Sequence, residues 1–425
     1  MPGPDNDQPA PSPFSPGSLL EVFLVALRLG LTSFGGPIAH LGYFRQEYVA
    51  RRRWLDERSY ADIVALSQSL PGPASSKVGI IIGTLRAGMA GGFMAWLGFT
   101  LPSALALVLF AYGVQRFTTG DAGWLHGLKI AAVSVVAQAV WGMSRNLAPD
   151  RPRATIAVAA AIVALVWPHA WTQVLIIVAA GLAGWRLLQA SAVQAERRSI
   201  ATGVPPWVGI GALALFFGLL LGLPLLRQFW SGHWLAVVDS FYRAGSLVFG
   251  GGHVVLPLLQ TEVVAPGWVT QEQFLAGYGA TQAAPGPIFT FSAYLGTVMG
   301  PPPNGIIGGI LALGAIFMPA FLLAWGPLPF WDILRTRPAF QSVLRGVNAA
   351  VVGLLLAALY NPVWTSAVKA PQDFALAVIA LALLMLWKVP PWLVVVLAAA
   401  GGAALAALPG LGNPPWPPFA KGGIW

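Results

Sequence analysis

The sequence predicts an all-α protein that crosses a membrane several times and consists of two related halves of inverted topology. Three observations lead to this prediction: a composition too apolar for a soluble protein, an internal repeat, and positive charge that differs between the two copies of the repeat. Hydrophobic residues make up 56% and charged residues 9% of the 425-residue chain, whereas soluble domains contain roughly a quarter charged residues. With a mean hydropathy of +0.70, the chain has too little charge to cover a soluble surface of this size.

Transmembrane helices are expected wherever an apolar segment, taken with its weakly polar flanks, reaches about 18–20 residues. In chain order these segments are Gly88–Val114, Trp124–Leu147, Ala154–Trp167, Trp171–Leu188, Trp207–Leu226, Gly305–Trp325, Ala339–Tyr360, Phe374–Trp387 and Trp392–Leu408. Residues 1–17 are rich in proline and lack a basic segment ahead of an apolar one, which predicts a disordered tail and no signal peptide. The absence of cysteine excludes disulfides, cysteine-ligated zinc and thiol catalysis.

An internal repeat divides the chain. Arg28-Leu-Gly30 stands ahead of Phe34-Gly-Gly, and Arg243-Ala-Gly245 stands ahead of Phe249-Gly-Gly at the same spacing. Further matches follow in the same order: Glu47 with Glu262, Trp54 with Trp268, Gln68 with Gln282, Pro71-Gly72-Pro73 with Pro285-Gly286-Pro287, and Leu128-Lys129 with Leu344-Arg345. We therefore divide the chain into a disordered cytoplasmic tail (1–17), an N-terminal membrane repeat (18–190), a linker with a connecting transmembrane helix (191–233), a C-terminal membrane repeat (234–410) and a second tail (411–425).

The orientation of the halves follows from their charges. The loop Arg45–Arg58 contains five arginines, whereas the matching loop Gln260–Gln273 contains no lysine or arginine. Because positive charge accumulates in cytoplasmic loops, the first loop is predicted to be cytoplasmic and the second extracytoplasmic. The repeats are then inverted, with the N-terminus in the cytoplasm and the C-terminus outside. This placement also accounts for the net charge of +9, so we do not expect nucleic-acid binding.

The Pro-Gly-Pro motifs predict re-entrant helical hairpins. Since Arg58 and Arg86 both belong on the cytoplasmic side, Ser59–Leu85 must enter and leave by one face, with Pro71–Pro73 (the first tip) at its turn. Gln271–Val298 would enter from the other face and turn at Pro285–Pro287 (the second tip). A third hairpin, Leu19–Arg51, would turn near Gly35-Gly36-Pro37. The alternative is a set of full crossings kinked by proline, which we consider less favourable because it would place arginines outside.

The two tips are the predicted binding site for the transported solute. Pro-Gly-Pro ends one helix and starts another, and such a break at membrane depth is tolerated only inside protein or beside a wet cavity. The half-helix after the first tip presents free N–H groups and a partial positive charge, with Ser75, Ser76 and Lys77 in its first turn. This set suits a tetrahedral oxyanion, although Lys77 could instead pair with a carboxylate or snorkel. The second tip is followed by Thr290 and Ser292 and by no cation, so the site should be asymmetric, with the anion nearest the first tip and the second tip completing the cavity.

Several other residues are candidates whose roles the sequence leaves open. Gln68 and Gln282 precede the tips by one turn and would either contact the ligand or cap freed backbone groups. Arg28 and Arg243 would either serve transport or pair with the repeated acids, and those acids, Glu47 and Glu262, are the candidates for proton coupling. His40 and His253 follow the glycine breaks without matching each other, and each is either a packing group or a gating group.

The motifs resemble the chromate transporter family, specifically its long, two-domain members. The resemblance rests on Phe34-Gly-Gly-Pro-Ile-Ala-His40, on Arg53-Trp-Leu55, on Ser67-Gln-Ser-Leu-Pro-Gly-Pro-Ala-Ser-Ser-Lys-Val-Gly79, and on their diverged copies Phe249-Gly-Gly-Gly-His253 and Ala280-Thr-Gln-Ala-Ala-Pro-Gly-Pro287. It implies export of chromate across the plasma membrane, driven by the membrane potential or a proton gradient and giving chromate resistance. Sulfate, an isosteric dianion, is the natural competing substrate.

We predict neither an enzyme nor a cofactor or metal site. The chain has no Walker motif, no Gly-x-Ser-x-Gly, no His-Glu-x-x-His and no cysteine cluster. A non-transporting membrane enzyme or scaffold would need a catalytic dyad or a soluble interaction domain, and we find neither. The expected partners are an oxyanion and the lipid bilayer; homodimerisation stays open, because one chain already contains both halves.

Overall fold

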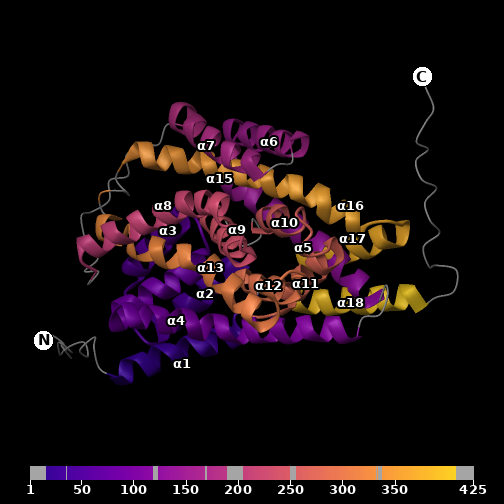
Figure 1. Cartoon of the computed structure of the whole chain (residues 1–425), viewed down its shortest axis with the longest axis horizontal. Helices are drawn as coiled ribbons and strands as arrows, with labels where there is room; N and C mark the ends of the chain where they lie inside the picture. The colour runs from indigo at the N-terminus through magenta and orange to yellow at the C-terminus, as the bar shows by residue number, and fades with distance from the viewer. Residues whose placement is uncertain are drawn as a thin grey trace, which may run out of the picture.

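The computed structural model describes residues 16–34, 36–117, 123–167, 170–188, 204–248, 255–331, 333 and 337–407, and these ranges contain helices and no strands (Figure 1). The N-terminal repeat contains α1 (Pro16–Thr32), α2 (Gly36–Phe44), the π-helix η1 (Arg45–Arg51), α3 (Glu57–Ser69), α4 (Ala74–Phe117), α5 (Gly123–Leu147), α6 (Arg151–Val166) and α7 (Ala170–Leu187). The helix α8 (Pro206–Phe229) connects the repeats. Most of the predicted tails, much of the predicted linker, Gly35, the break at Phe249-Gly-Gly and His253 lie outside the described residues.

The C-terminal repeat follows the same order of elements. It contains α9 (His233–Leu247), α10 (Val255–Val263), α11 (Gln271–Ala283), η3 (Ile288–Thr290), α12 (Phe291–Val298), α13 (Gly305–Trp325), η4 (Leu328–Phe330), α15 (Pro338–Ala358), η5 (Leu359–Trp364), α16 (Thr365–Ala367), α17 (Pro371–Met385) and α18 (Pro391–Ala407). By its position relative to the repeated motifs, α9 matches α1, α11 matches α3, and α15 matches α5.

Five helical stretches in the described part of the chain have the length and composition of membrane spans. The long apolar helical stretches are Ala74–Val114, Gly123–Leu147, Pro206–Phe229, Gly305–Phe330 and Pro338–Ala367, and shorter ones include Pro371–Met385 and Pro391–Ala407. Large apolar side chains lie on the outer surface, among them Phe229 at 88% and Trp207 at 74% exposure. Exposed apolar area of this extent is expected of a surface that faces lipid, so the prediction of an all-α, multi-pass membrane protein is confirmed.

The long helix α4 reverses direction instead of crossing as one rod. Ala87 and Gly88 leave helical geometry, with φ +67° at Gly88. The two arms then pack against each other so closely that a Cβ on Gly83 would lie 2.4 Å from the carbonyl oxygen of Gly91. The first arm, residues 74–86, spans about 20 Å at 1.5 Å per residue, which is shorter than the hydrocarbon core of about 30 Å.

The ends of the hairpin formed by α3 and the first arm of α4 lie together. Arg52, just ahead of α3, donates to Glu21 at 2.9 Å, and Arg86, at the end of the arm, donates to the same carboxylate at 3.2 Å. Both guanidinium groups also lie over the ring of Trp54, at 5.6 and 5.3 Å. The hairpin therefore starts and ends at one place, as the re-entrant arrangement requires.

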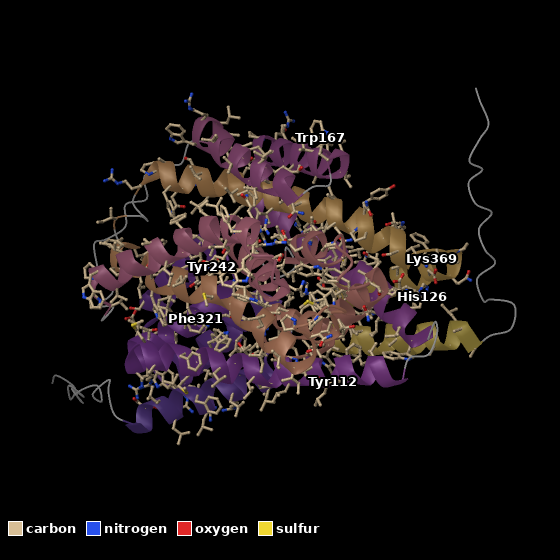
Figure 2. The ribbon with its side chains drawn as sticks, viewed as in Figure 1. Tyr112, His126, Trp167, Tyr242, Phe321 and Lys369 are labelled. Atoms are coloured by element: carbon tan, nitrogen blue, oxygen red, sulfur yellow. The ribbon has the colours of Figure 1, made fainter. Side chains whose placement is uncertain are left out.

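One helix of each repeat packs against helices of the other repeat. The helix α5 packs against α17 and α18 of the other repeat, and α15 packs against α6 and α7, as the upper part of Figure 1 shows for α15. Small residues permit the close approach: a Cβ on Gly127 would lie 2.1 Å from the carbonyl oxygen of Ala398. At one end of this contact His126 hydrogen-bonds Asp373 at 2.8 Å, close to Lys369 in Figure 2. The sequence boundaries of the repeats therefore do not separate two bodies.

Candidate functional site

Each tip donates a backbone hydrogen bond to the other repeat. The backbone N–H of Gly72, in the first tip, donates to the carbonyl of Val248 at 2.6 Å. The backbone N–H of Gly286, in the second tip, donates to the carbonyl of Ser33 at 2.9 Å. Ser33 and Val248 occupy matching positions, each directly ahead of a Phe-Gly-Gly motif. These two hydrogen bonds, Gly72 to Val248 and Gly286 to Ser33, join the two tips, and we call this contact the interlock.

Glycine is required at the centre of each tip. Gly72 has φ +97° and Gly286 has φ +94°, a region in which L side chains are strained. Space is also restricted, because a Cβ on Gly286 would lie 2.9 Å from Ser103 Oγ and 3.2 Å from the carbonyl oxygen of Phe99. The flanking prolines end the incoming helix and start the outgoing one, so Pro-Gly-Pro sets both the reversal and the close approach.

The side chain of Lys77 folds back onto the backbone of the first tip. This side chain is fully buried, and Nζ donates to the carbonyls of Leu70 at 2.5 Å and Pro71 at 2.7 Å. These carbonyls belong to the C-terminal end of α3, which carries partial negative charge. Among the described residues no carboxylate lies within ion-pair distance of Nζ, so of the structural alternatives neither a carboxylate pair nor snorkelling is formed. An ammonium group has three N–H donors, and one is left for a ligand.

His40 connects the first tip to the interlock. Its Nδ1 lies 3.3 Å from Ser75 Oγ, and its ring meets the ring of Phe99 edge-on at 5.3 Å. The backbone of Ser33, which accepts the bond from Gly286, lies beside the same ring. His40 therefore lies between the start of α4 and the residue that receives the second tip, and its side chain is 1% exposed.

A set of buried polar atoms without a hydrogen-bond partner surrounds the tips. Its members are Ser33 Oγ, His40 Nε2, Ser67 Oγ, Ser76 Oγ, Thr100 Oγ1 and Gln282 Nε2. A buried polar group left unpaired costs about 1–3 kcal/mol, and folded proteins contain few of them. Their concentration here indicates a place that receives a polar ligand or water. Ser33, Ser67 and Thr100 were not predicted; Ser67 stands inside the tip motif, whereas Thr100 lies far from it in sequence and carries no local signal.

The hydroxyl groups that follow the second tip are paired, unlike that of Ser76, which follows the first. Thr290 donates its hydroxyl to the carbonyl of Pro287 at 2.7 Å, and Ser292 donates to that of Phe289 at 2.8 Å, so both hydroxyl protons are used locally. At the positions that match Ser33, His40, Ser75, Lys77 and Thr100, the C-terminal repeat has the apolar residues Val248, Val255, Phe289, Phe291 and Phe317. The rings of Phe289 and Phe317 are in contact, with centroids 5.9 Å apart. The asymmetry between the repeats is thus larger than the missing cation alone.

The glutamines that precede the tips occupy unequal environments. Gln68 is exposed on α3, whereas Gln282 is half-buried on α11 with Nε2 enclosed and unpaired. Of the two, Gln282 is placed among the unpaired groups of the tips.

The repeated arginines and acids pair with each other. Arg28 Nη1 lies 3.9 Å from Glu47 Oε2, and Arg243 Nη2 lies 3.2 Å from Glu262 Oε2. Each pair belongs to a larger cluster. The first cluster contains Arg28, Arg51, Arg52 and Arg86 with Glu21 and Glu47, and the second contains Arg227 and Arg243 with Asp239 and Glu262. The first cluster has an excess of positive charge and the second is balanced.

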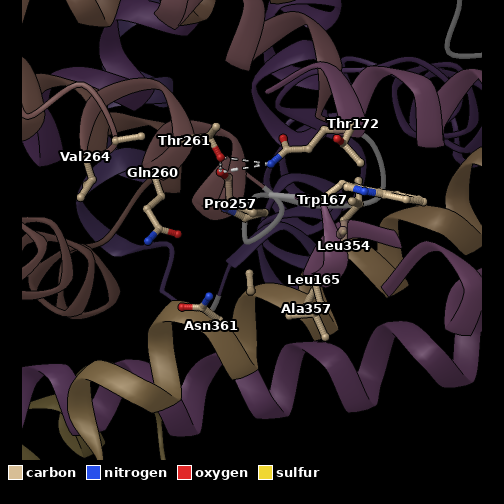
Figure 3. A pocket seen from close by; sticks show the side chains of 14 residues that line it. Leu165, Trp167, Thr172, Pro257, Gln260, Thr261, Val264, Leu354, Ala357 and Asn361 are labelled. Atoms are coloured by element: carbon tan, nitrogen blue, oxygen red, sulfur yellow. Dashed lines mark hydrogen bonds between the residues drawn. The ribbon is translucent and has the colours of Figure 1, made fainter. Parts of the chain in front are cut away.

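The cavity described in this conformation lies away from the tips. It has a volume of about 230 Å³ and lies between α6, α7, α10 and the end of α15 (Figure 3). The tips themselves are in direct contact through the interlock. We regard the interlock and its unpaired polar groups as the candidate site, because the chemistry gathers there and a closed site needs no open cavity.

Fold and site together define a multi-pass α-helical membrane protein with paired helix breaks, the architecture of secondary transporters. The sequence pattern of the chromate transporter family matches residues 20–185 and 235–403. The chain therefore belongs to the chromate transporter family, and it is a transporter, not an enzyme.

Curated relatives are similar over most of the chain. A chromate transport protein of Pseudomonas aeruginosa is 29% identical over 93% of this chain and 94% of its own length. A chromate transport protein of Cupriavidus metallidurans is 26% identical over 87% of this chain and 89% of its own. A probable chromate transport protein of Synechococcus elongatus is 26% identical over 91% and 95%. No solved structure matches the chain.

Proposed function

We propose that this protein exports chromate, or a closely similar tetrahedral oxyanion, from the cytoplasm, and that the anion binds between the first tip and His40. The observation that supports this most directly is the set of unpaired polar atoms beside the tips, five of which belong to the N-terminal repeat. Ser33, His40 and Thr100 match apolar residues of the C-terminal repeat, whereas Ser67 and Ser76 match Thr281 and Thr290, whose hydroxyls are paired locally. The names of the relatives supply the substrate class.

The proposed site supplies several hydrogen-bond donors to an anion, together with the single cation Lys77. The first turn of α4 presents free backbone N–H groups at the positive end of its dipole. Ser76 Oγ and the remaining N–H of Lys77 add two further donors, and Gln282 Nε2 adds one from the other repeat. A tetrahedral dianion has four acceptor oxygens, so it can satisfy donors that have no protein partner in the closed interlock.

Transport requires the interlock to open towards each face in turn. Two backbone hydrogen bonds, one per tip, hold it closed, and the arms beside each tip are short helices that can tilt as units. In this scheme the first tip approaches from the cytoplasm and the second from outside, with the protein in the plasma membrane. The Arg28–Glu47 and Arg243–Glu262 pairs then act as gates, one in each repeat, and protonation of Glu47 or Glu262 couples export to a proton gradient. Such export would give chromate resistance.

Export is tested by uptake of radiolabelled chromate into everted membrane vesicles, in which the cytoplasmic face is outermost. Ser76→Ala removes an unpaired hydroxyl and should lower the initial uptake rate about 10-fold or more, since one hydrogen bond to a charged group contributes about 1.5–3 kcal/mol. Ser144→Ala, which removes a half-buried hydroxyl near the end of α5 that donates to the carbonyl of Trp141, is the control. No uptake by the natural protein would refute export of chromate, and equal rates in the two variants would refute the site.

Sulfate is the second candidate substrate, because it shares the shape and charge of chromate. The donors of the proposed site are N–H and O–H groups, which do not by themselves distinguish the two ions. Unlabelled sulfate added to the same vesicles decides between them. Inhibition at equimolar sulfate makes the protein a general oxyanion transporter, and its absence makes chromate the preferred ion.

A further inference from the structure

The cavity in Figure 3 is lined by uncharged residues from both repeats. Its polar residues are Thr172 and Gln173 from the N-terminal repeat and Gln260, Thr261 and Asn361 from the C-terminal one. The other described lining residues are apolar or aromatic, and none of the fourteen is a lysine, arginine, aspartate or glutamate. By the charge-based orientation it lies near the extracytoplasmic face, because Gln260 begins the loop that lacks positive charge.

Gln173, one of the amide side chains that line the cavity, is weakly engaged. Gln173 Nε2 has only long contacts, 3.4 Å to the carbonyl of Pro257 and 3.3 Å to Thr261 Oγ1, drawn as dashed lines in Figure 3. Gln260 Nε2 donates to Gln271 Oε1 at 3.1 Å, and behind it Gln271 Nε2 is buried without a partner. Contacts near the upper limit of hydrogen-bond length are weak, so a ligand with stronger acceptors can replace those of Gln173.

The repeat relates this cavity to charged positions on the opposite side. Gln260 and Gln271 match Arg45 and Glu57 of the N-terminal repeat, and these two residues form an ion pair. In the register set by Leu128-Lys129 and Leu344-Arg345, Asn361 matches Arg145. Where the N-terminal repeat has ionised groups on the predicted cytoplasmic side, the C-terminal repeat thus retains hydrogen-bonding groups at the matching places and has no charge.

We propose that the cavity is a second, uncharged binding site for the exported oxyanion, from which the anion leaves the protein; this proposal rests on the export function proposed above. Amide and hydroxyl groups stabilise an anion without an ion pair, so binding is weak and release is fast. A conducting pathway needs sites of this kind, favourable enough to enter and weak enough to leave. The helix α10 also connects the two functions, because Thr261 lines the cavity while the adjacent Glu262 pairs with Arg243.

The test changes the charge of the cavity in both directions at one exposed residue. Asn361→Asp and Asn361→Lys are compared by equilibrium dialysis of the purified full-length protein with radiolabelled chromate. The carboxylate should weaken the lower-affinity binding about 10-fold or more and the ammonium should strengthen it by a similar factor, because a unit charge acts on a dianion across a few ångströms. In vesicles Asn361→Lys should also slow export, since release becomes slower.

Asn304 provides the matched control. It is an exposed asparagine on the same predicted side, at the start of α13 and outside the cavity, and it receives the same two substitutions. Opposite shifts at Asn361 with none at Asn304 support the proposal, whereas loss of binding in both Asn361 variants indicates a structural role and overturns it. If the natural protein shows a single class of chromate binding that Ser76→Ala removes and Asn361 does not affect, the second site is refuted and export stands. Absence of any binding or export refutes the function itself.

Discussion

At the scale of the residue, Lys77 combines a structural role in the first tip with a proposed role in anion binding. Its position after Pro-Gly-Pro predicted a functional cation, and the structure adds that the ammonium group also caps the carbonyls of Leu70 and Pro71. Partners beyond the motif, such as Ser33 and Thr100, could not be predicted. Ser33 directly follows α1 and Thr100 lies within α4, both apolar helices, and only the tertiary interlock brings these residues beside the tips.

Replacing Lys77 with methionine separates these two roles. Lys77→Met keeps the volume and removes the charge, so the two carbonyls lose their donors and the anion loses one. We expect export to be abolished and the protein to be destabilised by about 1–3 kcal/mol, the cost of an unpaired buried polar group. Thermal unfolding in detergent and chromate uptake into vesicles measure the two effects. Normal uptake in Lys77→Met would show that Lys77 only supports the tip.

At the scale of the element, each tip depends on a left-handed glycine. Gly286→Ala places a Cβ at φ +94° and within 2.9 Å of Ser103 Oγ. Such strain costs about 1–3 kcal/mol, and the shift needed to relieve it breaks the bond from Gly286 N–H to Ser33. We expect a lower unfolding temperature and loss of export. Gly42→Ala is the control, because Gly42 lies in α2 with nothing within 4 Å of its added Cβ. Equal stability of the two variants would contradict the reciprocal interlock.

The hairpin elements were the part of the fold that charges could predict. Arg86 predicted a turn of the chain, and the helix does reverse at Ala87 and Gly88, although the apolar stretch Ala74–Val114 alone would read as one long span. The cytoplasmic position of this turn stays a prediction. What charge could not predict is the packing of α5 and α15 against the other repeat. That packing depends on surface fit between small residues, such as Gly127 on Ala398, and apolar sequences give no partner preference.

At the scale of the whole molecule, the inverted arrangement predicts that the first hairpin enters from the cytoplasm and the second from outside. Single-cysteine labelling can test this prediction. The protein contains no cysteine, so each single-cysteine variant carries one labelling site. Glu57 and Met89 flank the first hairpin and Glu272 begins the second, and all three side chains are exposed. Replacing Glu57 removes only a surface ion pair with Arg45, which contributes little to stability. The expectation is that a membrane-impermeant thiol reagent labels Glu57→Cys and Met89→Cys from the cytoplasmic side.

The same reagent should label Glu272→Cys only from the extracytoplasmic side. The physical reason is that five arginines hold the first loop in the cytoplasm, and an arm of about 20 Å cannot carry residue 89 across the bilayer. Labelling of Glu57→Cys and Met89→Cys from opposite faces would mean that α3 and the first arm of α4 form a full crossing. Labelling of Glu272→Cys from the cytoplasm would instead make the repeats parallel, and the two tips would then approach from one face, which would leave the proposed export path without an outer gate.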